Sequence, residues 1–198
     1  MTGRRRNADD AERPPEDEAR LYGRALRLLA AHDRTAADLR TRLGRYGEPG
    51  TVARVIARLE AQRYLDDRRF AEAYTEREAL TRGAGARLVR AGLRSHGVAE
   101  DVVMREAERA SSAELETARA VARRALPRLS GLEPPVRARR LAGQLARRGY
   151  AASVVYQVVR EALRGAAALG GEAEAVLDGL AAADDLEGSD PSAPGEGP

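Results

Sequence analysis

One short pattern occurs three times in this chain at almost constant spacing. A leucine precedes a glycine by four residues, and a valine follows that glycine by five. The three copies are Leu43, Gly47 and Val52; Leu93, Gly97 and Val102; and Leu145, Gly149 and Val154. A period of about 50 residues is typical of arrays of supersecondary units, each packed on its neighbours. We therefore expect three divergent copies of one unit.

The glycines indicate what the unit contains. A glycine that follows a helix tolerates the left-handed conformation in which a Cβ would be strained. The residue before each valine, which is Thr51, Asp101 or Ser153, is a small polar type favoured near a helix start. Each pattern is therefore predicted to mark the junction between the second and third helices of a repeat.

Apolar residues recur at helical spacing in nine segments, and Ala, Leu, Arg and Glu dominate the composition. The expected helices begin near Ala19, Thr35, Pro49, Asp66 or Asp67, and Ala84, then near Val98, Ser111, Pro135 and Val154. Thr35 with Asp38, and Ser111 with Glu114, fit the capping-box spacing that opens a helix. The sequence predicts an all-α fold of three tandem three-helix repeats in an elongated, curved array.

The predicted organisation has five parts. A charged N-terminal tail, 1–18, and an acidic C-terminal tail, 165–198, are expected to be disordered. The three repeats are expected at 19–65, 66–110 and 111–164.

The net charge of +3 conceals an uneven distribution. Residues 165–198 hold 8 acids and no base, whereas residues 20–164 hold 30 arginines and 17 acids. A basic body with an acidic tail suggests an anionic partner and a tail able to compete for the same surface. All 34 basic residues are Arg, which binds phosphate and carboxylate in a bidentate manner, although a GC-rich genome is the simpler explanation for the absence of Lys.

Several classes of protein are disfavoured. No apolar run approaches the roughly 18 residues of a membrane span, and the N-terminus has no secretory apolar core. The chain has no Cys, so it has no disulfide or thiolate metal site. We expect a cytoplasmic monomer that is not an enzyme, binds no cofactor or metal and contacts no membrane.

The arginines of two predicted helices are the main candidates for partner contact. Arg87, Arg90 and Arg94 step at three and four residues along the fifth helix, so they share one face. The eighth helix and its end carry Arg137, Arg140, Arg147 and Arg148. Neither segment contains an acid, which favours an anionic partner, either DNA phosphate or an acidic protein surface, over a solvated face. The scarcity of aromatic side chains argues against base stacking.

Other polar residues have simpler interpretations. Asp66 fits the N-cap of the fourth helix, with Leu65 and Phe70 at the positions of a hydrophobic staple, and Asp67 at its first position suits the helix dipole. Gly83-Ala84-Gly85 is either an ordinary loop or a weak phosphate nest. His32 and His96 are isolated, and no P-loop motif is present.

The segment from Leu59 to Val98 resembles the centre of the RecX family of RecA regulators. The matching residues are Leu65, Asp66, Asp67, Phe70, Ala71, Arg77, Gly83, Leu88, Leu93 and Gly97. The resemblance continues through LAGQLARRGYAASVVYQVV and covers about residues 20–164, but neither tail.

The resemblance implies three tandem three-helix repeats and a regulator that binds RecA and its filament on single-stranded DNA. It implies modulation, mostly inhibition, of filament growth, ATP hydrolysis and strand exchange in DNA recombination, repair and the SOS response. Weak direct DNA binding stays open. The alternative is a helix-turn-helix transcriptional regulator, which needs a helix with base-reading side chains at its start.

Overall fold

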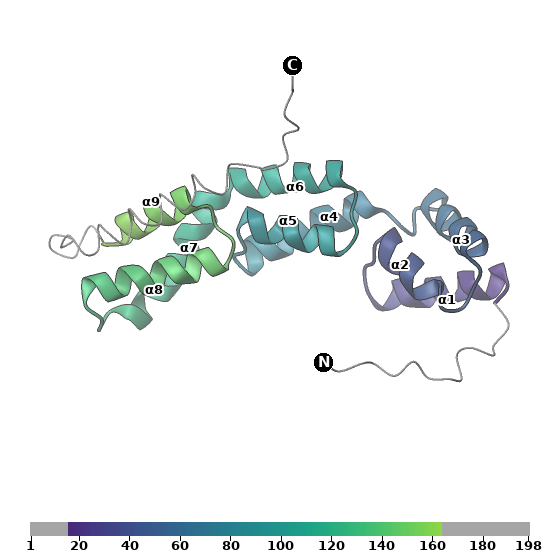
Figure 1. The fold of residues 1–198 in the computed structure, drawn as a ribbon, viewed down its shortest axis with the longest axis horizontal. Helices are drawn as coiled ribbons and strands as arrows, with labels where there is room; N and C mark the ends of the chain where they lie inside the picture. Colours follow the sequence, from purple (N-terminus) through teal and green to yellow (C-terminus); the bar gives the residue numbers. More distant parts are fainter. Residues whose placement is uncertain (1–15, 164–198) are drawn as a thin grey trace, which may run out of the picture. The chain divides into compact units, whose positions relative to one another are not determined.

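The structure, a computed structural model, describes residues 16–163, and its regular structure there is entirely helical (Figure 1). Within this range there are nine α-helices: α1 (Glu18–Ala31), α2 (Ala36–Leu43), α3 (Pro49–Ala61), α4 (Asp67–Glu76), α5 (Ala86–Ser95), α6 (Glu100–Ser112), α7 (Glu114–Leu129), α8 (Pro134–Arg147) and α9 (Ala152–Leu163). α4 continues directly into the π-helix η2 (Arg77–Thr81). The all-α prediction is confirmed for this range. Residues 1–15 and 165–198 of the predicted tails, and residue 164 of the predicted third repeat, lie outside it.

The folded part includes three residues assigned to the N-terminal tail from sequence: Glu16, Asp17 and Glu18. Asp17 is the N-cap of α1, and its side chain accepts the amide of Arg20 at 2.8 Å. The amide of Glu16 donates to the carbonyl of Tyr46 at 2.7 Å, and its carboxylate pairs with Arg24 at 2.5 Å. These contacts hold the segment before α1 against the turn after α2.

The chain divides into two compact units that are described separately. Among the described residues, the first unit comprises 16–73 and 93–102, and the second comprises 74–92 and 103–163. The helices α4, α5 and α6 therefore contribute residues to both units.

Helices α1, α2 and α3 enclose the hydrophobic core of the first unit. Its fully buried side chains include Leu21, Ala25, Leu39, Leu43, Val55, Ile56 and Leu59, and Leu65 completes the cluster from the segment before α4. These apolar positions recur at three and four residues, so each helix turns one stripe inward. Thr35 caps α2 as predicted, accepting the amide of Asp38 at 3.1 Å.

Helices α7, α8 and α9 form the core of the second unit and lie side by side in Figure 1. Its buried side chains include Ala118, Ala122, Leu129, Ala138, Leu141, Leu145, Val155, Val158, Val159 and Leu163. Arg119 of α7 ties this bundle together at its surface, because it pairs with Glu161 of α9 at 2.8 Å.

The three leucines of the threefold pattern are all core residues. Leu43, Leu93 and Leu145 have no exposed surface. On the fifth helix, Leu88 is 47% exposed, whereas Val89 and Leu93 are fully buried.

The glycine prediction is correct in two copies of three. Gly97 and Gly149 have φ values of +70° and +81°, the left-handed conformation expected after a helix. Gly47 does not adopt it; α2 ends at Leu43, and a Cβ at Gly47 would overlap the side chain of Leu21. Close packing, and not backbone conformation, therefore requires this glycine.

Candidate functional site

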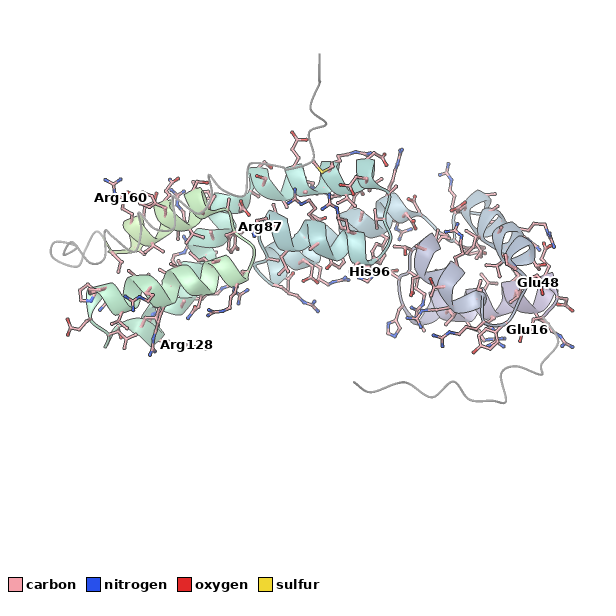
Figure 2. All side chains as sticks on the ribbon, viewed as in Figure 1. Glu16, Glu48, Arg87, His96, Arg128 and Arg160 are labelled. Carbon is pink, nitrogen blue, oxygen red and sulfur yellow. The ribbon has the colours of Figure 1, made fainter. Side chains whose placement is uncertain are left out.

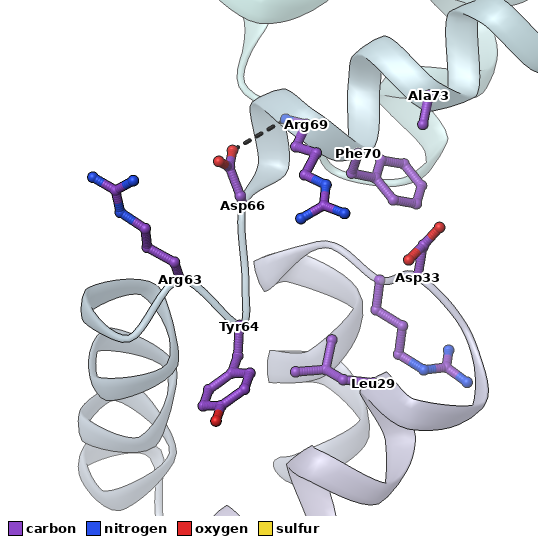
Figure 3. A pocket seen from close by; sticks show the side chains of 9 residues that line it. Leu29, Asp33, Arg63, Tyr64, Asp66, Arg69, Phe70 and Ala73 are labelled. Atoms are coloured by element: carbon purple, nitrogen blue, oxygen red, sulfur yellow. Dashed lines mark hydrogen bonds between the residues drawn. The ribbon is translucent and has the colours of Figure 1, made fainter.

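The start of α4 is held by its own acidic N-cap. Oδ1 of Asp66 accepts the amides of Arg68 at 3.0 Å and Arg69 at 3.1 Å, as expected for a residue that caps the first turn. Figure 3 shows the second of these bonds.

The carboxylate of the neighbouring residue, Asp67, forms a hydrogen bond with a different helix. It accepts the amide of Ala36, the first residue of α2, at 2.8 Å. Beside it the hydroxyl of Thr35 donates to the carbonyl of His96 at 2.6 Å, and Gly97 lies where a Cβ would overlap that of Ala37. Burial raises the pKa of Asp67 above its usual value, although the Ala36 amide lowers it. These contacts connect the starts of α2 and α4 with the end of α5. We call them the first joint.

The second unit contains a joint built in the same way. Oε1 of Glu114, the first residue of α7, accepts the amide of Ala86, the first residue of α5, at 2.8 Å. A Cβ at Gly149 would approach the amide nitrogen of Leu88 to 2.7 Å. We call this the second joint. Asp67 and Glu114 thus occupy equivalent positions.

The capping box predicted for Ser111 and Glu114 is wrong. Ser111 lies in the last turn of α6, and α7 begins at Glu114 after Ala113, which makes no side-chain cap hydrogen bond. Glu114 is buried and serves the second joint instead. Sequence reasoning missed this role, although the 47-residue offset from Asp67 to Glu114, close to the repeat period, was an available signal.

The hydrogen bonds of Gly83-Ala84-Gly85 favour the ordinary-loop interpretation over a phosphate nest. The amide of Ala84 donates to the carbonyl of Glu78 at 2.8 Å, and that of Gly85 donates to the carbonyl of Arg148 at 2.7 Å. Gly83 has a φ of +66°, and its carbonyl accepts the buried hydroxyl of Tyr150 at 3.0 Å. The loop is part of the second joint, and these two amides are not available to an anion.

A pocket of about 220 Å³ lies beside the start of α4 (Figure 3). It is lined by Leu29, Asp33, Arg34, Arg63, Tyr64, Asp66, Arg69, Phe70 and Ala73. Its charges are mixed, and Tyr64 is 60% exposed. Such a lining suits a polar protein segment better than a phosphate, which would meet two carboxylates.

The α5 arginines have different surroundings. Arg87 and Arg94 are exposed, whereas Arg90 is half-buried. Arg94 forms an ion pair with Glu100 of α6. α5 itself has no acid, but α6 supplies one to Arg94. The charge of Arg94 is therefore balanced, which weakens the case that this residue contacts an anionic partner.

The four arginines of α8 and its end fall into two groups with different roles. Nη2 of Arg137 donates to the carbonyls of Ser130 and Leu132, each at 2.9 Å, and Arg148 donates to carbonyls in the loop before α5. These two hold loops in place. Arg140 and Arg147 are exposed and form no ion pair in the described part of the chain, so they remain candidates for partner contact.

Comparisons with known proteins match all three repeats. Family models described as the first, second and third three-helix domains of RecX match residues 22–59, 66–104 and 112–159. The chain is 41% identical over 167 residues to "Regulatory protein RecX" of Thermobifida fusca, covering 80% of this chain and 90% of that protein. It is 38% identical to the protein of that name from Mycolicibacterium smegmatis, covering 77% and 85%.

The chain belongs to the RecX family. Two solved RecX structures share the fold. A crystal structure of RecX from Lactobacillus salivarius has a TM-score of 0.66 at 17% identity, covering 78% of this chain and 97% of that one. A crystal structure of a regulatory protein RecX has a TM-score of 0.64 at 23% identity and covers 73% of each.

Of the other residues that carry the RecX resemblance, two are buried and two lie against aromatic rings. Leu65 and Ala71 are buried, with exposed fractions of 4% and 0%. Phe70 packs edge-on against His96, with ring centroids 5.2 Å apart. The guanidinium of Arg77 lies 5.5 Å from the ring centroid of Tyr74, at the start of η2.

The described part of this RecX chain holds no cluster of acids and histidines able to bind a metal ion. The same residues contain no helix long and apolar enough to cross a membrane.

Proposed function

We propose that this chain binds RecA and RecA filaments on single-stranded DNA, and that it modulates their activity, mostly by inhibition. The affected steps are filament growth, ATP hydrolysis and strand exchange. The observation that supports this most directly is the 41% identity to a named RecX regulator across 90% of that regulator's length, which spans all three repeats. The same proposal places the chain in the cytoplasm, as a monomer, in DNA recombination, repair and the SOS response.

The chain acts in this proposal by binding and not by bond chemistry. The conspicuous acids at the starts of α4 and α7, Asp66, Asp67 and Glu114, bond to backbone amides. They are therefore occupied in holding helices. By contrast, the exposed Arg140 and Arg147 carry charge that nothing in the described residues neutralises. Repeated contacts of this kind with successive RecA subunits would add through effective concentration.

The test is a titration of the full chain into RecA on single-stranded DNA. We expect the DNA-dependent ATPase rate of RecA to fall at amounts well below one chain per RecA, because one bound chain then affects a run of subunits. Strand exchange should fall over the same range. A saturating amount that leaves ATPase and strand exchange unchanged would overturn the proposal.

A pair of variants tests whether the α8 arginines take part. The double variant Arg140→Gln with Arg147→Gln is expected to weaken inhibition. The control variant, Arg123→Gln with Arg160→Gln, removes the same charge from exposed positions on α7 and α9. Sequence-selective binding to duplex DNA, without any effect on RecA, would instead favour the helix-turn-helix regulator.

A further inference from the structure

A second pocket, of about 150 Å³, lies in the second unit and is lined mainly by arginines. α7 forms one wall, the end of α8 another, and the residue that follows η2 closes it. The lining residues are Arg82, Val121, Arg124, Ala125, Arg128, Gln144 and Arg148. Arg128, near the C-terminal end of α7, is labelled in Figure 2. We call it the arginine pocket; its lining contains four guanidinium groups and no carboxylate.

Two of these arginines have no compensating charge. Arg124 and Arg128 are exposed, lie one turn apart on α7, and form no ion pair in the part of the chain that the structure describes. Like charges at this spacing disfavour the helix. Arg82 does pair with Glu78, at 2.7 Å, but its side chain remains 66% exposed and Glu78 does not line the pocket.

The fourth arginine is held in place by neutral groups. Nη1 of Arg148 donates to the carbonyls of Arg82 and of Gly83, the latter at 3.3 Å. The carbonyl of Arg148 itself accepts the amide of Gly85 at 2.7 Å. These bonds fix the guanidinium but leave its charge unbalanced, and a positioned charge of this kind loses little entropy when an anion binds.

We propose that the arginine pocket binds a phosphate group. The guanidinium fork matches the tetrahedral oxygens of phosphate and can bond to them in a bidentate manner. The pocket, of about 150 Å³, has room for one phosphate group. No aromatic side chain lines the pocket, so it offers no platform for a base. The pocket therefore recognises the phosphate group without a base. That phosphate belongs either to a nucleic-acid backbone or to a free phosphate compound.

The experiment compares the full chain with two charge-matched double variants. The pocket variant carries Arg124→Gln and Arg128→Gln, and the control variant carries Arg123→Gln and Arg160→Gln. Both pairs of arginines are exposed, and each double substitution removes two positive charges from helices of the second unit. Fluorescence anisotropy with a 20-nucleotide oligo-dT at several salt concentrations, without RecA, keeps the result independent of the proposed RecA partner.

Binding to a backbone phosphate predicts about a tenfold loss of oligo-dT affinity in the pocket variant relative to the control variant. The slope of log affinity against log salt should also become shallower by about 0.7 for each phosphate that the variant no longer neutralises. If the ligand is instead a free phosphate compound, tripolyphosphate should raise the thermal midpoint of the wild type but not that of the pocket variant. The oligo-dT affinities of the two proteins should then agree.

Two outcomes would overturn the proposal. One is that the pocket and control variants behave alike with both oligo-dT and tripolyphosphate. The other is that only poly-glutamate distinguishes them, since the pocket would then recognise protein carboxylates and not phosphate.

Discussion

At the scale of single residues, the acids that begin α4 and α7 carry the most structural information. Asp67 and Glu114 each accept the first amide of a helix from the preceding set of three, at 2.8 Å in both cases. An amide at a helix start has no partner within its own helix, so a carboxylate there both satisfies the donor and interacts favourably with the helix dipole. Each acid therefore joins two helices with one bond.

Asp67 makes the stability of the protein depend on pH in a direction set by its burial. Burial raises the folded-state pKa, so the folded state ionises less readily than the unfolded chain, where the pKa is about 3.9. The contribution of Asp67 to stability should therefore decrease as the pH rises from about 3.9 through the raised pKa, and stay constant above it.

Asp67→Asn tests this, because asparagine keeps an acceptor for the Ala36 amide and does not ionise in this range. Urea unfolding between pH 3.5 and 7 should show the variant gaining stability relative to the wild type as the pH rises. Asp67→Ala, which lacks the acceptor, should be less stable than Asp67→Asn at every pH. A pH-independent difference between wild type and Asp67→Asn would contradict the prediction.

At the scale of elements, the glycines after α5 and α8 let neighbouring helices approach closely. Gly149 combines a φ of +81° with a backbone neighbour, the Leu88 amide, where a side chain would lie. Gly23, inside α1, is the contrasting case, because a Cβ there meets nothing within 4 Å.

Two alanine substitutions should therefore have opposite effects. Gly149→Ala should lower the free energy of unfolding by about 1–2 kcal/mol for the left-handed conformation alone, with more from the contact at Leu88. Gly23→Ala should raise it by about 0.5–1 kcal/mol, since alanine is the better helix former. Chemical denaturation of both variants measures this, and a Gly149→Ala protein as stable as the wild type would show that the second joint is misplaced.

The sequence predicts the elements well because one signal, helical periodicity, repeats three times. Leu43, Leu93 and Leu145 follow from it directly. The joints were not predictable in the same way, because their bonds connect residues far apart in the chain. Glu114 matched a local capping pattern with Ser111, and the longer-range bond to Ala86 proved to be its role. Arg124 and Arg128 were missed because only the packing of α7 against α8 gathers them with Arg148.

At the scale of the whole molecule, charge is divided between the basic body and the acidic residues at the C-terminus. Residues 165–198, which lie outside the described residues, contain 8 acids and no base. We propose that such a segment, held on the same chain at high effective concentration, competes with anionic partners for the exposed arginines.

Deleting residues 165–198 is therefore expected to tighten binding to single-stranded DNA at low salt. The salt dependence should steepen by about 0.7 in slope for each additional phosphate neutralised. Replacing the exposed Arg140 and Arg147 by Gln in the truncated chain should reverse the gain. A chain in which the 8 acids become amides separates charge from length, and identical titration curves for full-length and truncated chains would leave the segment only a solubilising role.

The bond that forms each joint also has a direction. A helix start in one repeat supplies an N–H, and the next repeat supplies the carboxylate. At the first repeat the corresponding position, the first residue of α1, is Glu18, and its carboxylate already pairs with Arg54 at 2.9 Å. The acceptor at that end is therefore engaged within its own repeat.

At the other end the donor is missing. α8 begins with Pro134, in the position where α2 and α5 have Ala36 and Ala86. Proline has no N–H, although it fits the first turn of a helix well. A fourth repeat, or a second copy of the chain, thus cannot be added through the bond that joins the first three. Because Pro134 has no N–H, the start of α8 lacks the first-residue donor that α2 and α5 use to form the two joints.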